Sequence, residues 1–287
     1  MLNYFQILIL ALIQGACELL PVSSSAHVIA AAKLMGVKDV SSPEMVMLLI
    51  LLHTGTMFAV IVYFWKRWKR DYFASSVQFQ WFAIQVILGT VCTVVVGLGL
   101  KVLIEKVFMR GQPHAEVEDL FNNLPLIAGA LMAVGLLIIY AGWREEKSPR
   151  QAEIQPAHSC WIGIVQGLCL PFRGFSRSGA TISTGLILGL PKQKLEEFSF
   201  ALAVVLTPLV IADEAHRLVK AHALSGPDSV LHLLVPGLIG MIFSFVAGLL
   251  ALKWLSRWLE GGRWKFFGYY CLAAAAGVLV LHFALPR

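Results

Sequence analysis

A glutamate in the middle of an apolar run is the first residue of this sequence whose type and position could do chemistry. Glu18 follows Gln14 by four positions, so both side chains lie on one face of an expected helix. Ionisable groups inside a membrane are energetically costly and usually mark a functional site. The Glu18 carboxylate could bind a divalent cation, act as a general base, or only form a structural hydrogen bond. The residues alone leave these alternatives open.

A run of three serines follows Glu18 and precedes a histidine. A hydroxyl beside an imidazole is the minimum set for an activated nucleophile or an acid–base step, and Ser23, Ser24, Ser25 and His27 supply it. Serines also cap helices, and we expect a helix to begin around Ala26. The free N–H groups at its N-terminus would favour a phosphate, so capping and anion binding are compatible here.

A second polar segment contains a buried arginine. Arg177 lies between Ser176 and Ser178, and Thr181 follows at the expected start of another helix. A guanidinium, hydroxyls and a helix N-terminus together favour a phosphate oxyanion. A buried arginine needs an anionic partner, which is either Glu18 or a bound phosphate. The alternative is an ion pair that only joins two parts of the chain. Arg173 either extends the anion site or faces solvent.

His53 lies in another apolar run and is followed by Thr54-Gly55-Thr56. A lone histidine in an apolar helix usually makes an interhelical contact, and a role in the site is the alternative interpretation. Without knowledge of any family, the acid, hydroxyls, imidazole and guanidinium predict a phosphate-bearing ligand reached from the lipid phase.

The composition restricts the class of protein that positions these residues. Hydrophobic residues make up 58% of the 287 residues and charged residues only 14%, against roughly a quarter in ordinary soluble domains. The apolar runs are long and continuous, which excludes a transmembrane β-barrel. The net charge of +6 could suit nucleic acid, but the basic residues cluster at the ends of apolar runs. We expect an all-α integral membrane protein with no nucleic-acid partner.

Hydropathy predicts six full transmembrane helices and two interrupted regions. The interrupted regions are residues 3–36, broken by Pro21 and the serines, and residues 158–190, broken by Pro171 and the Ser-Arg-Ser segment. We interpret each as a re-entrant helical hairpin with a polar tip, although two ordinary kinked spans per region are the alternative. The six runs are 44–65, 82–104, 125–142, 197–218, 230–252 and 265–284.

The two interrupted regions resemble each other. A Gln-Gly pair at Gln14 recurs at Gln166, and the serine run matches the Ser-Arg-Ser segment. Three spans separate the two copies, so the second copy enters the membrane from the opposite side. Residues 1–287 therefore form a single membrane domain with an inverted-topology repeat, of which one half is about 1–143 and the other about 157–287. The two hairpin tips should meet near the midplane.

The Lys and Arg residues predict an orientation. The larger and more tightly clustered set includes residues 66–70, 144–150, 192–194 and 253–265, so we place that side in the cytoplasm. Both termini then face outward, and the site is expected to open on that outer side, with access from both sides as the alternative. The segments 105–124 and 144–157 are expected to be solvent loops.

Two motifs resemble the signatures of the undecaprenyl-diphosphate phosphatase family of the bacitracin-resistance type. The similarity covers nearly the whole chain. Two positions depart from the usual pattern, because Arg173 stands where the family has a proline and Ala26 where it has a glycine. The motifs are Glu18-Leu-Leu-Pro21-Val-Ser23-Ser24-Ser25-Ala-His27 and Gly174-Phe-Ser176-Arg177-Ser178-Gly179-Ala-Thr181.

The resemblance implies a membrane hydrolase that converts undecaprenyl diphosphate to undecaprenyl phosphate and inorganic phosphate. It also implies a divalent cation, Mg²⁺ or Ca²⁺, near Glu18 and Gln14. Ser24 and His27 match the nucleophile and acid–base positions, and Arg177 holds phosphate. The implied substrate-binding residues are Ser23, Ser25, Ser176, Ser178, Thr181 and Arg173.

The expected partners are a polyprenyl diphosphate lipid and membrane lipid, with a homodimer as a further possibility. The competing function is a polyprenyl-phosphate flippase or transporter, because an inverted repeat with broken helices is typical transporter architecture. A transporter has no need of a nucleophile, so the acid, serine and histidine favour the enzyme.

Overall fold

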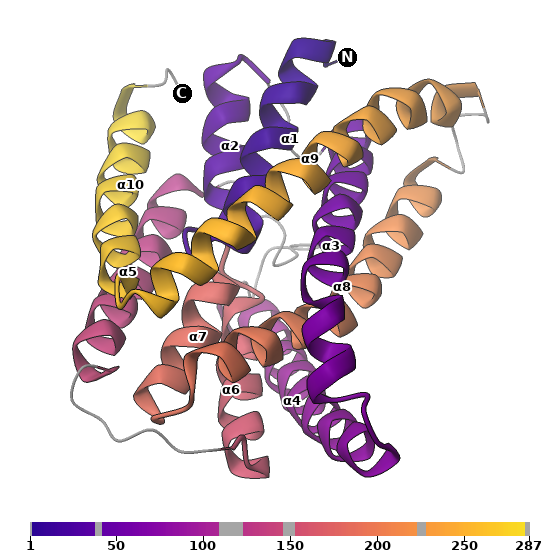
Figure 1. Cartoon of the computed structure of the whole chain (residues 1–287). Coiled ribbons are helices and arrows are strands. Elements are labelled where there is room, and N and C mark those ends of the chain that lie inside the picture. The colour runs from indigo at the N-terminus through magenta and orange to yellow at the C-terminus, as the bar shows by residue number, and fades with distance from the viewer. Residues whose placement is uncertain (1, 38–41, 109–122, 146–152, 223–227, 285–287) are drawn as a thin grey trace.

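The structure is a computed structural model, and it describes residues 2–37, 42–108, 123–145, 153–222 and 228–284. All regular structure in these ranges is helical (Figure 1). The helices are α1 (Tyr4–Leu19), α2 (Ser24–Leu34), α3 (Pro43–Asp71), α4 (Ser76–Leu103), the π-helical turn η1 (Ile104–Phe108), α5 (Leu124–Glu145), α6 (Pro156–Cys169), α7 (Arg177–Ile187), α8 (Lys192–His222), α9 (Asp228–Glu260) and α10 (Trp264–Ala284).

Six of these helices are long and apolar enough to cross a membrane, which confirms the six predicted spans. They are α3, α4, α5, α8, α9 and α10. Most extend beyond the apolar run that predicted them. Serine caps allow some of the helices to begin before the apolar run, and basic residues stabilise additional turns at their C-terminal ends. Ser42 caps α3 and Ser75 caps α4, while Lys69 and Arg70 lie in the last turn of α3.

The expected loops are only partly described. In the first, residues 105–108 belong to the π-helical turn that continues α4, and residue 124 begins α5. In the second, residues 144–145 end α5, residues 153–155 lie directly before α6, and residues 156–157 begin it, so the ends of both expected loops are helical. Residues 109–122 and 146–152 lie outside the described part of the chain. The expectation of solvent loops therefore stays a prediction for most of both segments.

Each interrupted region folds as two short helices joined by a tight turn. Pro21 lies in the turn between α1 and α2, and Pro171 lies in the turn between α6 and α7. Ser23 and Ser176 cap the second helix of each pair by accepting hydrogen bonds from the N–H groups of Ala26 and Gly179. The cap at Ser23 starts α2 at Ser24, two residues earlier than the sequence-based expectation.

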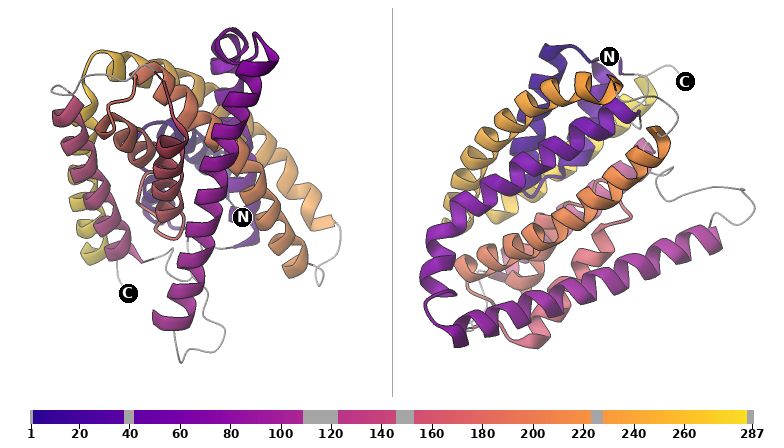
Figure 2. Two further views of the ribbon diagram at one scale, coloured as in Figure 1. Left: turned by 90° about the horizontal axis from the view of Figure 1, so that it is seen from below. Right: turned by 90° about the vertical axis from the view of Figure 1, so that its right-hand side faces the viewer.

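Each of these helical hairpins packs against a long helix from the other half of the chain. Helix α1 lies against α9, and α6 lies against α4. The repeated Gln-Gly pair explains the close approach: a side chain at Gly15 would collide with the Ser244 carbonyl, and one at Gly167 would collide with the Thr93 carbonyl. Helix α9 also runs alongside α3 (Figure 2), and the Ser244 hydroxyl donates to the Leu52 carbonyl across that contact.

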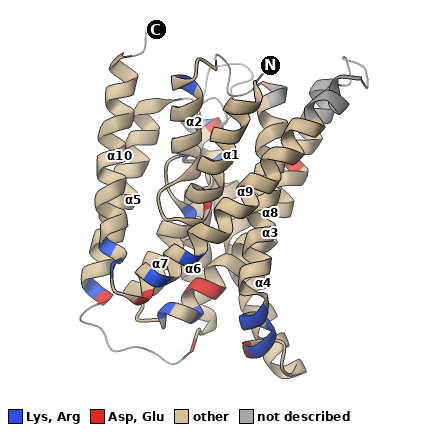
Figure 3. Cartoon of the chain, turned by 45° about the horizontal axis from the view of Figure 1, so that its top comes forward, with Lys and Arg blue, Asp and Glu red and all other residues tan. Residues whose placement is uncertain are grey.

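Among the described residues, most Lys and Arg gather at one end of the molecule, opposite the end that carries both termini (Figures 1 and 3). Two ion pairs join the helices there. Lys192 Nζ lies 2.5 Å from Glu145 Oε1, and Arg67 Nη1 lies 3.6 Å from the nearly fully buried Glu196. Ser256 of α9 donates a hydrogen bond of 2.5 Å to the same Glu196 carboxylate. The basic end of the bundle is therefore tied together by buried polar contacts.

Candidate active site

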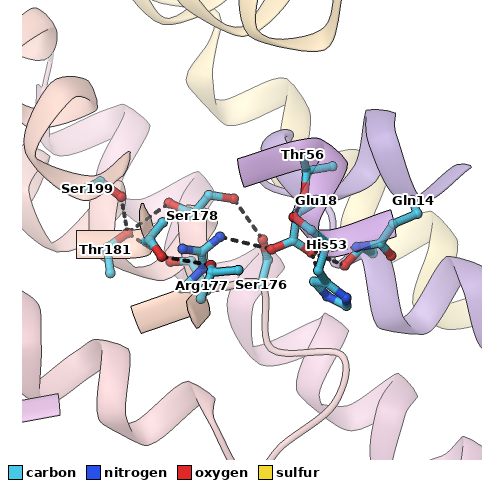
Figure 4. Close-up of polar contacts among 12 residues, drawn as sticks. Gln14, Glu18, His53, Thr56, Ser176, Arg177, Ser178, Thr181 and Ser199 are labelled. Carbon is cyan, nitrogen blue, oxygen red and sulfur yellow. Dashed lines mark hydrogen bonds and ion pairs between the residues drawn. The ribbon is translucent and has the colours of Figure 1, made fainter. Parts of the chain in front are cut away.

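The tips of the two hairpins meet through an ion pair. Arg177 Nη2 donates to Glu18 Oε1 over 2.9 Å, and only 18% and 16% of the two side chains are exposed (Figure 4). Helix α1 ends at Leu19 and α7 begins at Arg177, so the pair joins a helix C-terminus to a helix N-terminus. Beside it, the Ser178 hydroxyl donates to the Leu20 carbonyl over 3.1 Å. Of the two partners predicted for Arg177, the structure places Glu18 against it.

The second oxygen of the Glu18 carboxylate accepts two further hydrogen bonds. Ser24 Oγ donates to Glu18 Oε2 over 2.6 Å, and Gln14 Nε2 donates over 3.1 Å. Gln14 is one helical turn before Glu18 on α1, and Ser24 opens α2. The carboxylate is thus fixed between a guanidinium, a hydroxyl and an amide, and it is placed to accept a proton from Ser24.

An imidazole faces this carboxylate, and it comes from His53 on α3. His53 Nε2 lies 3.6 Å from Glu18 Oε2, while His53 Nδ1 is 2.8 Å from the Leu49 carbonyl. A carbonyl only accepts, so Nδ1 carries the proton and Nε2 is directed toward the carboxylate. Sequence reasoning favoured an ordinary interhelical contact for His53. The following Thr54-Gly55-Thr56 was the only signal, since Thr56 lines the cavity described below.

His27, which the sequence places among the catalytic candidates, has both ring nitrogens engaged elsewhere. Its Nδ1 lies 2.7 Å from the Ser23 carbonyl, and its Nε2 lies 2.7 Å from the hydroxyl of Tyr270 on α10. The two rings are stacked with their centroids 5.6 Å apart. Ser25 contacts Ser23 through their hydroxyls at 3.3 Å. The imidazole of His27 is therefore directed at α10, whereas that of His53 is directed at Glu18.

The remaining predicted residues surround Arg177. Ser176 and Ser178 are buried, with their hydroxyl oxygens 3.4 Å apart. Thr181 is fully buried, and its hydroxyl contacts Ser199 of α8 at 2.6 Å and donates to the Arg177 carbonyl over 2.9 Å. Arg173 is half-buried in the turn before α7. Thr181 therefore braces α7 against α8 in this structure.

A small pocket opens beside the ion pair. Glu18 and Arg177 form its polar end, and Thr56 and Thr207 add hydroxyls. The rest of its wall is apolar and comes from α1, α3 and α8, with Leu19, Met57, Val60, Ala203 and Val204. A charged headgroup with an apolar tail would match this distribution of polar and apolar walls.

The donor set near Glu18 limits how a cation could be held. Among the described residues, no group of three or more His, Cys, Asp or Glu side chains is placed to hold a metal ion. Ser24 Oγ, Gln14 Nε2 and His53 Nε2 are directed at Glu18 Oε2, and the Gln14 amide would have to turn its oxygen toward a cation to coordinate it. One carboxylate is what Mg²⁺ commonly takes from a protein when substrate phosphates and water complete its coordination. A cation at this place would therefore need phosphate and water oxygens to complete its coordination.

The fold and the site define a multi-pass helical membrane protein with an acid–arginine pair in its interior. A sequence model of the family described as bacitracin resistance protein BacA matches residues 7–277. The chain therefore belongs to that family.

Curated relatives of similar length carry the name of one enzyme. A protein of Acinetobacter baylyi named undecaprenyl-diphosphatase 2 is 56% identical over 283 residues, covering 98% of both chains. Proteins named undecaprenyl-diphosphatase from Bacteroides fragilis and Polaromonas are 31% and 33% identical, and they cover 98% and 95% of this chain and 98% and 92% of their own lengths.

Proposed function

We propose that this protein hydrolyses undecaprenyl diphosphate to undecaprenyl phosphate and inorganic phosphate, and so recycles the lipid carrier used in cell-wall synthesis. The Glu18–Arg177 ion pair at the polar end of a mostly apolar cavity is the observation that carries the proposal. The names of the relatives supply the substrate class, because eight similar proteins are called undecaprenyl-diphosphatases.

Arg177 is the proposed phosphate-binding group. Its guanidinium lies in the cavity wall, and α7 begins at the same residue, so the free N–H groups of the helix support the same anion. The other predicted substrate-binding residues lie in or next to the N-termini of α2 and α7: Ser23, Ser25, Ser176, Ser178, Thr181 and Arg173. The prenyl chain would lie along the apolar wall between α3 and α8.

Ser24 is the proposed nucleophile, and Glu18 is its proposed base. The 2.6 Å hydrogen bond from Ser24 Oγ to Glu18 Oε2 gives the hydroxyl proton a direct acceptor. Attack of Ser24 Oγ on the terminal phosphorus breaks the bond to the bridging oxygen, and undecaprenyl phosphate leaves. Water then releases inorganic phosphate from the serine. Phosphoryl transfer depends mainly on positioning and charge stabilisation, which Arg177 provides.

A divalent cation, Mg²⁺ or Ca²⁺, is a further part of the proposal. Glu18 and Gln14 would hold it, and His53 faces the same carboxylate oxygen. When bound with the substrate, such an ion neutralises charge on the diphosphate oxygens. Glu18 would exchange one of its present hydrogen bonds for this contact, so phosphate release should require added cation and stop with a chelator.

The membrane placement is also proposed. Helices α1, α2, α6 and α7 are too short to span comfortably, at 16, 11, 14 and 11 residues, which supports two re-entrant hairpins. The reciprocal packing of α1 on α9 and α6 on α4 supports an inverted-topology repeat. The basic end, closed by Arg67–Glu196 and Lys192–Glu145, suits the cytoplasmic face of an inner membrane. The site would then open to the periplasm. A homodimer stays a prediction.

Phosphate release by the purified protein tests the proposed activity. In detergent with undecaprenyl diphosphate and a divalent cation, wild type should release phosphate, and Arg177→Ala and Ser24→Ala should not. Arg257→Ala is the matched control, because this exposed arginine lies at the far end of α9. Normal turnover by a folded Arg177→Ala protein would overturn the assignment.

An assay in reconstituted vesicles distinguishes hydrolysis from the competing flippase function. Wild type should release phosphate from lipid, and lipid movement across the bilayer without phosphate release would favour transport instead. The names of the relatives and the hydrogen bond from Ser24 to Glu18 favour the enzyme.

A further inference from the structure

The turn that carries the reactive serine is strained. Among the described residues, Ser23 is the non-glycine residue with a positive φ, at 67°. A β-carbon makes this conformation unfavourable, and proteins keep it only where surrounding contacts enforce it. Ser23 caps α2 and directly precedes Ser24. The position of the Ser24 hydroxyl on Glu18 therefore depends on contacts that hold the turn of residues 20–23.

Two adjacent residues of α10 supply such contacts. Cys271 Sγ donates to the Pro21 carbonyl over 3.3 Å. Tyr270 reaches the other end of the turn through His27, whose Nε2 is 2.7 Å from the tyrosine hydroxyl and whose Nδ1 is 2.7 Å from the Ser23 carbonyl. Helix α10 thus contacts the strained turn directly at Pro21 and reaches Ser23 through His27.

The hydrogen-bond directions follow from the donor inventory. The Ser23 carbonyl can only accept, so His27 Nδ1 carries a proton and donates to it. In the neutral ring, Nε2 then accepts from the hydroxyl of Tyr270. The backbone N–H of His27 lies 3.5 Å from the same Ser23 carbonyl, so the imidazole is the closer donor. The lone pair that a general base would use is occupied by Tyr270.

We propose that His27 and Tyr270 are positioning residues, which hold the strained turn and so place Ser24 against Glu18. This inference rests on the proposed hydrolysis, and it assigns to Glu18 the proton transfer for which the sequence also nominated His27. To hold the turn, the side chain of residue 27 needs only a hydrogen-bond donor at its δ position, and residue 270 needs only a hydroxyl.

Substitutions at residue 27 distinguish positioning from proton transfer. Asparagine places an amide N–H where His27 Nδ1 lies, but it cannot transfer a proton at neutral pH, whereas glutamine and alanine lack a donor at that point. We expect His27→Asn to keep kcat within about tenfold of wild type, and His27→Gln and His27→Ala to lose about 100-fold or more. Equal loss in all three variants would show that His27 transfers a proton and would overturn the proposal.

Tyr270→Phe tests the second link while keeping the stacked ring. It should lower kcat about fivefold, which is the effect of one neutral hydrogen bond, with KM unchanged. In the His27→Asn background it should have no further effect, because the partner of the hydroxyl is gone. Tyr269→Phe, one residue away and also exposed, is the control and should match wild type.

Hydrogen exchange tests the turn without reference to catalysis. Tyr270→Phe should raise deuterium uptake in the peptide that covers residues 18–28, and Tyr269→Phe should not. Unchanged uptake in Tyr270→Phe would overturn the proposal even if the protein hydrolyses its substrate. If wild type releases no phosphate from any prenyl diphosphate, the proposed function fails, and the exchange result still decides whether α10 holds the turn.

Discussion

Glu18 and Arg177 are 159 positions apart in the chain, and their Oε1 and Nη2 atoms lie 2.9 Å apart inside the bundle. Each belongs to a different hairpin, so the pair exists only when both halves have folded together. Breaking a buried pair by removing one partner leaves an uncompensated charge, which costs far more than removing both partners. This asymmetry makes the pair testable by stability as well as by activity.

We predict that Glu18→Gln and Arg177→Met each destabilise the protein by about 3 kcal/mol, since each leaves one buried charge unpaired. The double variant should recover most of the thermal stability but none of the turnover. Melting in detergent and phosphate release, measured on the same preparations, check both statements. A double variant less stable than either single variant would show that the pair is not the main electrostatic contact of the tips.

His53→Leu should lower kcat about tenfold, equivalent to roughly 1.4 kcal/mol of transition-state stabilisation, because the imidazole 3.6 Å from Glu18 Oε2 is lost. Thermal stability should change little, since the side chain is 31% exposed. Steady-state kinetics and melting on purified protein provide the comparison. Unchanged kcat with a lower melting temperature would mean that His53 only packs α3 against α1.

Thr181→Val removes a hydroxyl that is fully buried against Ser199 and the Arg177 carbonyl. We expect it to destabilise the protein by about 1–2 kcal/mol, because the buried Ser199 hydroxyl loses its contact with Thr181. KM should stay unchanged. Thr181→Ser should restore stability. A raised KM at normal stability would instead place Thr181 in contact with substrate, as the family resemblance implies.

Gly15→Ala and Gly167→Ala should each destabilise the protein by about 1–3 kcal/mol, because the added methyl group meets the backbone of α9 or α4. Gly129→Ala is the matched control, since no described atom lies within 4 Å of the added carbon. That helical control should be neutral or stabilising by about 1 kcal/mol. If all three variants melt alike, close helix approach does not explain the repeated Gln-Gly pair.

The sequence predicted the elements better than it predicted the directions of the side chains. Continuous apolar runs defined all six spans, and Pro21 and Pro171 marked the interrupted regions. A charged residue in an apolar run needs a partner, which made Glu18 one of the two candidates for Arg177. These inferences rest on the length of the apolar runs and on the cost of burying a charge, which can both be judged from a short stretch of sequence.

Side-chain direction depends on packing between distant helices, which a single sequence does not specify. His27 shares a short segment with Ser24, yet its ring turns toward Tyr270, 243 positions away. His53 lies in another span, yet it faces Glu18 because α1 packs on α3. Motif spacing therefore pointed to His27, the histidine nearest to Ser24 in sequence. Helix packing instead places His53 beside the Glu18 carboxylate.

The packing of α1 on α9 has a consequence for biosynthesis. A nascent chain releases α1 into the bilayer long before α9, at Asp228–Glu260, has been translated. Until then the groove on α9 that receives Gly15 does not exist, although Arg177 at the start of α7 has already been translated. A ribosome stalled before residue 228 should thus hold an insertion intermediate whose first hairpin is open to protease or thiol reagents, and co-expressed halves of the chain should rescue each other where either half alone is degraded.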